Sequence, residues 1–147
     1  MASKLRTASW VLLALVGVSV LSISLISARL AYGTAEYPIG GVSLTDVAAG
    51  REAVATALRG IRGTSAAYAA GFAVLFLAIV AGPYRRGEGW AWWAILAGAL
   101  AVGVLVLGRV PLLGVAMGAG GTGAALLQTA LVVFALLIDV GRLGAKR

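Results

Sequence analysis

Long, mostly apolar runs alternate along this chain with short segments that contain the charged residues. A helix rises about 1.5 Å per residue, so about 20 apolar residues cross the hydrocarbon core of a bilayer, which is about 30 Å thick. We expect spanning helices at about residues 9–29, 64–82, 89–108 and 122–140. The pattern therefore predicts an all-α fold: a four-helix transmembrane bundle that forms a single membrane domain over residues 1–147.

Helix-breaking residues define the ends of these predicted spans. Pro83 is expected to stop the second span, and the charged turn at 84–88 is so short that the second and third helices must be antiparallel neighbours. Arg109, Val110 and Pro111 are expected to end the third span. The glycines between residues 118 and 123 predict a loop or a broken helix before the fourth span.

The first apolar run has a second interpretation. Lys4 and Arg6 followed by apolar residues are also typical of a secretory signal peptide, and the serines near the end of the run resemble a cleavage region. We expect a retained first span instead. Serines in such a span bond carbonyls of their own helix or reach a neighbouring helix, and a polar channel lining is the alternative.

The longest polar segment, residues 30–63, predicts an outer loop followed by a surface helix. Tyr32 and Tyr37 are expected to anchor the loop at the membrane interface. Ser43, followed three residues later by Asp46, resembles a capping box, so a short helix is expected over Leu44 to Leu58. That helix would lie near the membrane surface.

Composition narrows the chemistry that the chain can perform. Of the 147 residues, 61% are hydrophobic and 12% charged, about half the charged share of an average soluble domain. The absence of Cys and His removes disulfides, thiol chemistry, metal binding through these side chains and the usual general base near neutral pH. We expect no catalytic residues, no metal and no cofactor, so the chain is not predicted to be an enzyme.

Basic residues predict the orientation. The side that would hold both chain ends carries Lys4, Arg6, Arg85, Arg86, Arg142, Lys146 and Arg147 against Glu88 and Asp139. The other side carries Arg29, Arg51, Arg59, Arg62 and Arg109 against Glu36, Asp46 and Glu52. Because cytoplasmic loops are enriched in Lys and Arg, both termini are expected in the cytoplasm. The net charge of +7 is dispersed over several helix ends, so nucleic acid is not an expected partner.

Outer-side arginines are the candidate binding residues. Arg29, Arg59, Arg62 and Arg109 all lie at predicted outer ends of spans, where a bundle would bring several of them together. Guanidinium groups hold carboxylates and phosphates through paired hydrogen bonds, so these residues would bind the anionic headgroup of a lipid or a small amphiphile. In the competing interpretation, each arginine extends to lipid phosphate or pairs with Glu36, Asp46 or Glu52.

Two more local features carry structural expectations. Gly71, Gly98 and Gly103 are predicted packing positions, because small residues let membrane helices approach closely. Asp139 lies one turn before Arg142, which is its expected ion-pair partner. A proton-relay role for Asp139 is the alternative.

Several of these features resemble a known family. They are Leu58-Arg59-Gly60, Gly63, Gly71, a short basic turn, a glycine-rich third span ending Gly108-Arg109, and Gln128 in the fourth span. Over about Ala57 to Leu143 the chain resembles a bacterial family of small four-span membrane proteins catalogued as a domain of unknown function. The resemblance implies a four-helix membrane fold and supplies no activity. Members often have an acid where this chain has Gln128 and a glycine where it has Thr64.

These observations favour a non-catalytic membrane protein in the inner membrane of a bacterium. Small size, abundant Gly and Ala and the lack of reactive residues are typical of an accessory or scaffold subunit. Its partners would be the lipid bilayer and either another membrane protein or further copies of itself. The alternative is a binder or carrier of an anionic lipid or small amphiphile through the outer arginines.

Overall fold

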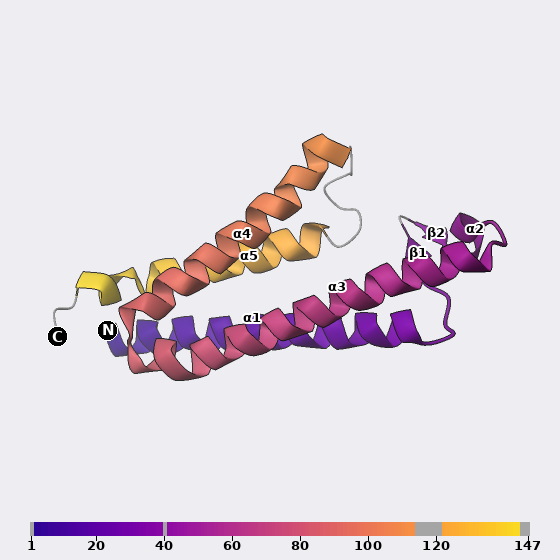
Figure 1. Cartoon of the computed structure of the whole chain (residues 1–147). Coiled ribbons are helices and arrows are strands. Elements are labelled where there is room, and N and C mark those ends of the chain that lie inside the picture. The colour runs from indigo at the N-terminus through magenta and orange to yellow at the C-terminus, as the bar shows by residue number, and fades with distance from the viewer. Residues whose placement is uncertain (1, 40, 114–121, 145–147) are drawn as a thin grey trace. The chain divides into compact units, whose positions relative to one another are not determined.

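The computed structural model describes residues 2–39, 41–113 and 122–144, and in this part of the chain the fold is all-α (Figure 1). Its helices are α1 (Ala2–Tyr32), α2 (Leu44–Ala48), α3 (Glu52–Ile79), α4 (Gly89–Leu113) and α5 (Thr122–Ile138). A π-helical turn, η1 (Val80–Tyr84), continues α3, and a 3-10 turn, η2 (Val140–Gly144), follows α5. The strands β1 (Pro38–Ile39) and β2 (Val42–Ser43) form a small antiparallel pair.

Three of the described helical segments are long and apolar enough to cross a membrane. They are Lys4–Tyr32, Glu52–Tyr84 and Gly89–Leu112. The apolar helix Thr122–Ile138 is shorter, at 17 residues. These lengths support a membrane protein with transmembrane helices.

The predicted surface helix over Leu44 to Leu58 is wrong in its extent. Ser43 does cap α2, because its Oγ accepts a hydrogen bond of 3.0 Å from the amide of Asp46. The helix then ends at Ala48, since Ala49 and Gly50 both have positive φ angles, 49° and 72°. This left-handed backbone cannot continue an α-helix, so α3 begins anew at Glu52.

Pro83 does not stop the second long helix as predicted. It lies inside η1, where the amide of Arg85 bonds the carbonyl of Val80, five residues earlier. The wider π turn accommodates a residue that has no amide hydrogen and would clash in a regular α turn. The helix turns away only at Gly87, whose φ of 89° suits glycine.

The third span also runs further than its predicted end. Helix α4 continues through Arg109 and Pro111 to Leu113. The glycine-rich loop predicted between residues 118 and 123 lies outside the described residues, except that Thr122 and Gly123 begin α5.

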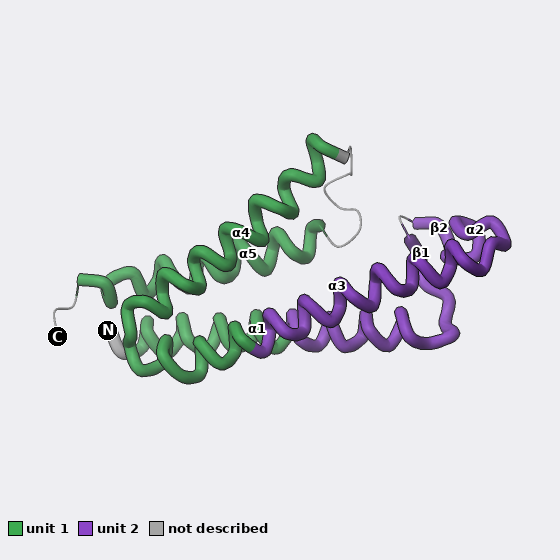
Figure 2. Tube along the Cα trace, viewed as in Figure 1, with its two compact units in different colours: residues 1–18, 75–147 green, residues 19–74 purple. Residues whose placement is uncertain are grey.

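The chain divides into two compact units (Figure 2). Unit 1 comprises Met1–Val18 and Leu75–Arg147, and unit 2 comprises Ser19–Val74. In unit 1, α4 and α5 pack against each other (Figure 1). Trp92 bonds Leu136 while Gly103 lies against Thr129, so these two helices are antiparallel.

The three predicted packing glycines have different surroundings. A Cβ atom at Gly103 would lie 3.1 Å from Cγ2 of Thr129, so this glycine permits the close approach of α4 and α5. Gly98 is half-buried in α4. Gly71 is exposed on α3, and a Cβ atom there would meet nothing within 4 Å. Gly71 therefore packs against no described residue of its own chain.

Candidate functional site

Unit 1 contains a buried group of polar side chains, which we call the polar cluster: Ser9, Tyr84, Asp139 and Arg142. All four are at most 6% exposed. The hydroxyl oxygens of Ser9 and Tyr84 lie 2.6 Å apart, and Ser9 donates to the carbonyl of Ala135 over 2.7 Å. Tyr84 Oη also lies 3.2 Å from Asp139 Oδ2. Because a phenol has one hydrogen, Tyr84 donates to Ser9 or to Asp139 at any instant.

Arg142 closes the polar cluster. Its Nη2 lies 2.5 Å from Asp139 Oδ2, which confirms the predicted ion pair, and its Nη1 donates to the carbonyl of Tyr84 over 2.6 Å. The guanidinium also stacks on the Tyr84 ring, 3.9 Å from the ring centroid. Arg142 Nε is buried without a hydrogen-bond partner among the described residues. A buried charge of this kind is tolerated because an opposite charge touches it.

Local backbone geometry brings these side chains together. The 3-10 turn after α5 has about three residues per turn, so Asp139 and Arg142 project from the same side. The π turn before Arg85 places the Tyr84 carbonyl where Arg142 reaches it. A cation at the carbonyl end of a helix is also favoured by the helix dipole.

The polar cluster is closed to water and to substrates, because none of its four side chains has appreciable exposure. Arg6 lies between the polar cluster and the surface. Its Nε is 3.9 Å from Asp139 Oδ1, and about half of its side chain is exposed. Among the described residues there is no group of three or more Asp, Glu, His or Cys side chains that would hold a metal ion. The arrangement ties α1, η1 and the end of α5 together within unit 1.

Two of the predicted ligand-binding arginines are engaged inside unit 2. Arg59 donates from Nη1 to the carbonyl of Gly33, just beyond the end of α1. Arg62 donates from Nε to Ser27 Oγ over 3.1 Å and stacks 4.1 Å from the centroid of the Tyr37 ring. These contacts attach α3 to α1 and to the connection that follows α1.

The other two candidate arginines are exposed. Arg29 belongs to unit 2 and Arg109 to unit 1, and neither forms an ion pair with a described residue. Two of the three acids expected as their partners have other contacts: Glu36 accepts from Thr45 over 2.5 Å, and Asp46 accepts from Ser43 over 2.7 Å.

Sequence reasoning missed most of the polar cluster. Asp139 and Arg142 were paired because they are three residues apart, but Ser9 and Tyr84 are 75 residues apart and share no motif. Tyr84 belongs to the charged turn predicted at residues 84–88, yet it is completely buried. One signal was available, since all four residues belong to segments predicted to meet at the same membrane face.

Neither a protein-family model, nor a curated protein, nor a solved structure matches this chain. The resemblance to the bacterial four-span family therefore stays a prediction.

Proposed function

We propose that this chain is a non-catalytic scaffold subunit that crosses a bacterial inner membrane four times and associates with further copies of itself. The burial of the polar cluster supports a non-catalytic role, because its hydroxyl and carboxylate groups are withdrawn from any substrate. The basic residues near the chain ends support cytoplasmic termini.

The length of helix α5 supports the proposal that it is a fourth membrane-spanning helix. Its 17 residues lie at the lower limit of about 17 to 25 for a spanning helix. The hydrogen bond from Ser9 to Ala135 joins the first part of α1 to the last part of α5 in unit 1. An even number of spans agrees with this contact, since both chain ends would then face the same compartment.

The observation that carries the scaffold proposal is an uncovered face of α3, which we call the α3 seam. It consists of Gly60, Thr64, Ala67, Gly71 and Val74, all exposed and all in unit 2. Their alternating spacing of four and three keeps them on one side of the helix. A Cβ atom at Gly60 or Gly71 would meet nothing within 4 Å.

An exposed seam of small residues suits contact with another helix better than contact with lipid. In a bilayer, helices associate through close backbone approach and van der Waals packing, both of which small residues permit. All five seam residues are exposed, so this face of α3 is available to a partner. A second copy offers the same seam, and symmetric self-association is the commonest assembly.

Cysteine cross-linking in native membranes tests the proposal, because the chain has no cysteine of its own. With an added oxidant, Ala67→Cys in the α3 seam should give a covalent dimer of this chain. Ser65→Cys is the matched control, because Ser65 is exposed and lies nearly opposite Ala67 on the same helix. Equal cross-linking of both variants, or none with Ala67→Cys, would contradict a self-associating seam, and a conjugate of different mass would identify a different partner.

The alternative function, an anionic-lipid or amphiphile binder acting through the outer arginines, has less support. Arg59 and Arg62 already have partners within unit 2, which leaves Arg29 and Arg109 for an external anion.

A further inference from the structure

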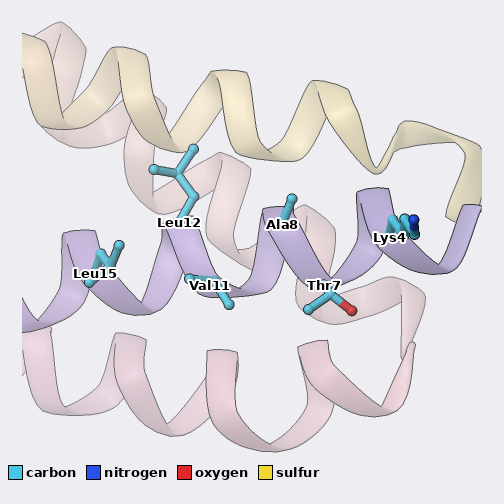
Figure 3. Close-up of a pocket in the computed structure, with 6 residues that line it drawn as sticks. All are labelled: Lys4, Thr7, Ala8, Val11, Leu12 and Leu15. Atoms are coloured by element: carbon cyan, nitrogen blue, oxygen red, sulfur yellow. The ribbon is translucent and has the colours of Figure 1, made fainter. Parts of the chain in front are cut away.

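A groove runs along the first part of α1, within unit 1 (Figure 3). It is a shallow, open hollow of about 610 Å³, and the residues that line it all lie on one face of α1: Lys4, Thr7, Ala8, Val11, Leu12 and Leu15. Lys4 lies at one end and Leu15 at the other (Figure 3). The groove is therefore apolar along its length and positively charged at one end.

The length of the groove matches one leaflet of a bilayer. Leu15 follows Lys4 by eleven positions, which corresponds to about 16 Å along a helix axis. Half of the hydrocarbon core is about 15 Å thick. A lysine at the headgroup level therefore places Leu15 near the middle of the membrane.

Lys4 is exposed and has no ion-pair or hydrogen-bond partner among the described residues. The other described basic residues near the chain ends and the turn after α3 are all engaged. Arg6 and Arg142 face Asp139, Arg86 bonds Glu88 over 2.9 Å, and Arg85 stacks on Trp10. The ammonium group of Lys4 is thus available for an external anion.

We propose that this groove binds one anionic phospholipid, with the phosphate at Lys4 and one acyl chain along Val11 and Leu15. The occupant follows from the combination of features: a free cation at the membrane surface complements a phosphate, and an apolar groove one leaflet long complements an acyl chain. Val11, Leu12 and Leu15 in the lining have bulky branched side chains, whereas close helix contacts in membranes are enriched in small residues. The proposal needs α1 to cross the membrane and is independent of the α3 seam.

Native mass spectrometry of the full chain tests this site. The protein is reconstituted into nanodiscs of phosphatidylcholine with a minor share of phosphatidylglycerol, and retained phosphatidylglycerol is counted after release. The unaltered chain should retain one molecule per chain. Lys4→Gln should reduce that retention about fivefold, the effect of one basic residue near an anionic surface.

Two matched pairs separate a specific groove from general attraction. Arg86→Gln removes one charge from another exposed residue of unit 1 and should leave the retention unchanged. Val11→Trp fills the groove without changing charge and should abolish the retention, whereas Val104→Trp, at an exposed position of α4, should not. Unchanged retention in Lys4→Gln and Val11→Trp, or an equal loss in Arg86→Gln, would overturn the proposal. If the unaltered chain instead carries a bound protein, and Val11→Trp loses that protein while Lys4→Gln keeps it, the groove binds a partner helix.

Discussion

The two units each place an arginine over a tyrosine ring, but they treat its charge differently. In unit 1, Arg142 lies 3.9 Å from the centroid of Tyr84 and pairs with Asp139. In unit 2, Arg62 lies 4.1 Å from the centroid of Tyr37 and bonds the hydroxyl of Ser27. Arg142 is buried, whereas Arg62 is half-buried.

The burial of the guanidinium group decides whether a stacked arginine needs an opposite charge beside it. A guanidinium that retains contact with water or headgroups keeps much of its solvation, so a ring face and a hydroxyl suffice around Arg62. A buried guanidinium has lost that solvation, and Asp139 must compensate for it. The two tyrosines differ accordingly: the Tyr84 hydroxyl has two neighbours, while the Tyr37 hydroxyl is buried without a partner among the described residues.

The largest expected effect comes from removing the counter-charge in unit 1. Asp139→Asn keeps the shape of the side chain but leaves Arg142 buried and unpaired, which should lower the free energy of unfolding by about 3 to 5 kcal/mol. Unfolding in mild detergent, followed by circular dichroism, measures the loss. Glu88→Gln, which breaks an exposed ion pair, is the control and should cost less than about 1 kcal/mol.

A double substitution sharpens this result. Asp139→Leu combined with Arg142→Met replaces both charges by apolar groups and should restore most of the stability that Asp139→Asn loses. A double variant as unstable as the single one would show that the charge pair is not what matters at this position.

A smaller effect is expected from the two tyrosine hydroxyls. Tyr84→Phe removes a hydroxyl that bonds Ser9 or Asp139, so it should lower the free energy of unfolding by about 1 kcal/mol. Tyr37→Phe removes a hydroxyl with no described partner and should be neutral or slightly stabilising. Thermal unfolding of the two variants measures both effects. Equal losses of stability in Tyr84→Phe and Tyr37→Phe would contradict the contrast between the units.

An effect no larger than that of Tyr84→Phe is expected at the stacked arginine of unit 2. Arg62→Gln loses the contact with the Tyr37 ring and the bond to Ser27, which together should cost about 1 kcal/mol. Limited proteolysis of the connection between α1 and α3 should become faster, because Arg62 attaches these segments. Arg109→Gln, an exposed arginine of unit 1, is the control, and an equal change in both variants would argue against a structural role for Arg62.

The predictions made from the sequence were right where all the residues responsible for a feature lie within one segment of the chain. Uninterrupted apolar residues made the long helices recognisable, and the spacing of Asp139 and Arg142 identified their ion pair. The helix ends were less reliable. Pro83 and Pro111 break regular helices in general, yet a π turn accommodates the first and α4 continues past the second.

The candidate site depended on contacts that no local pattern contains. Arg59 and Arg62 were expected to face an external anion, whereas Gly33, Ser27 and Tyr37 occupy them. Each partner lies some 25 or more residues away in sequence, on α1 or in the connection that follows it. Their identity becomes visible only when the antiparallel pairing of α1 and α3 in unit 2 is known.

Apolar composition and helical spacing therefore determined the fold class, the membrane-compatible helices and the local pair Asp139–Arg142, because burial in lipid and i to i+3 geometry act within one segment. Tertiary structure decided which polar groups are satisfied inside the chain. Ser9 reaches Tyr84 and Ala135 across separations of 75 and 126 residues. A buried polar atom needs a hydrogen-bond partner, and packing can supply that partner from any part of the sequence.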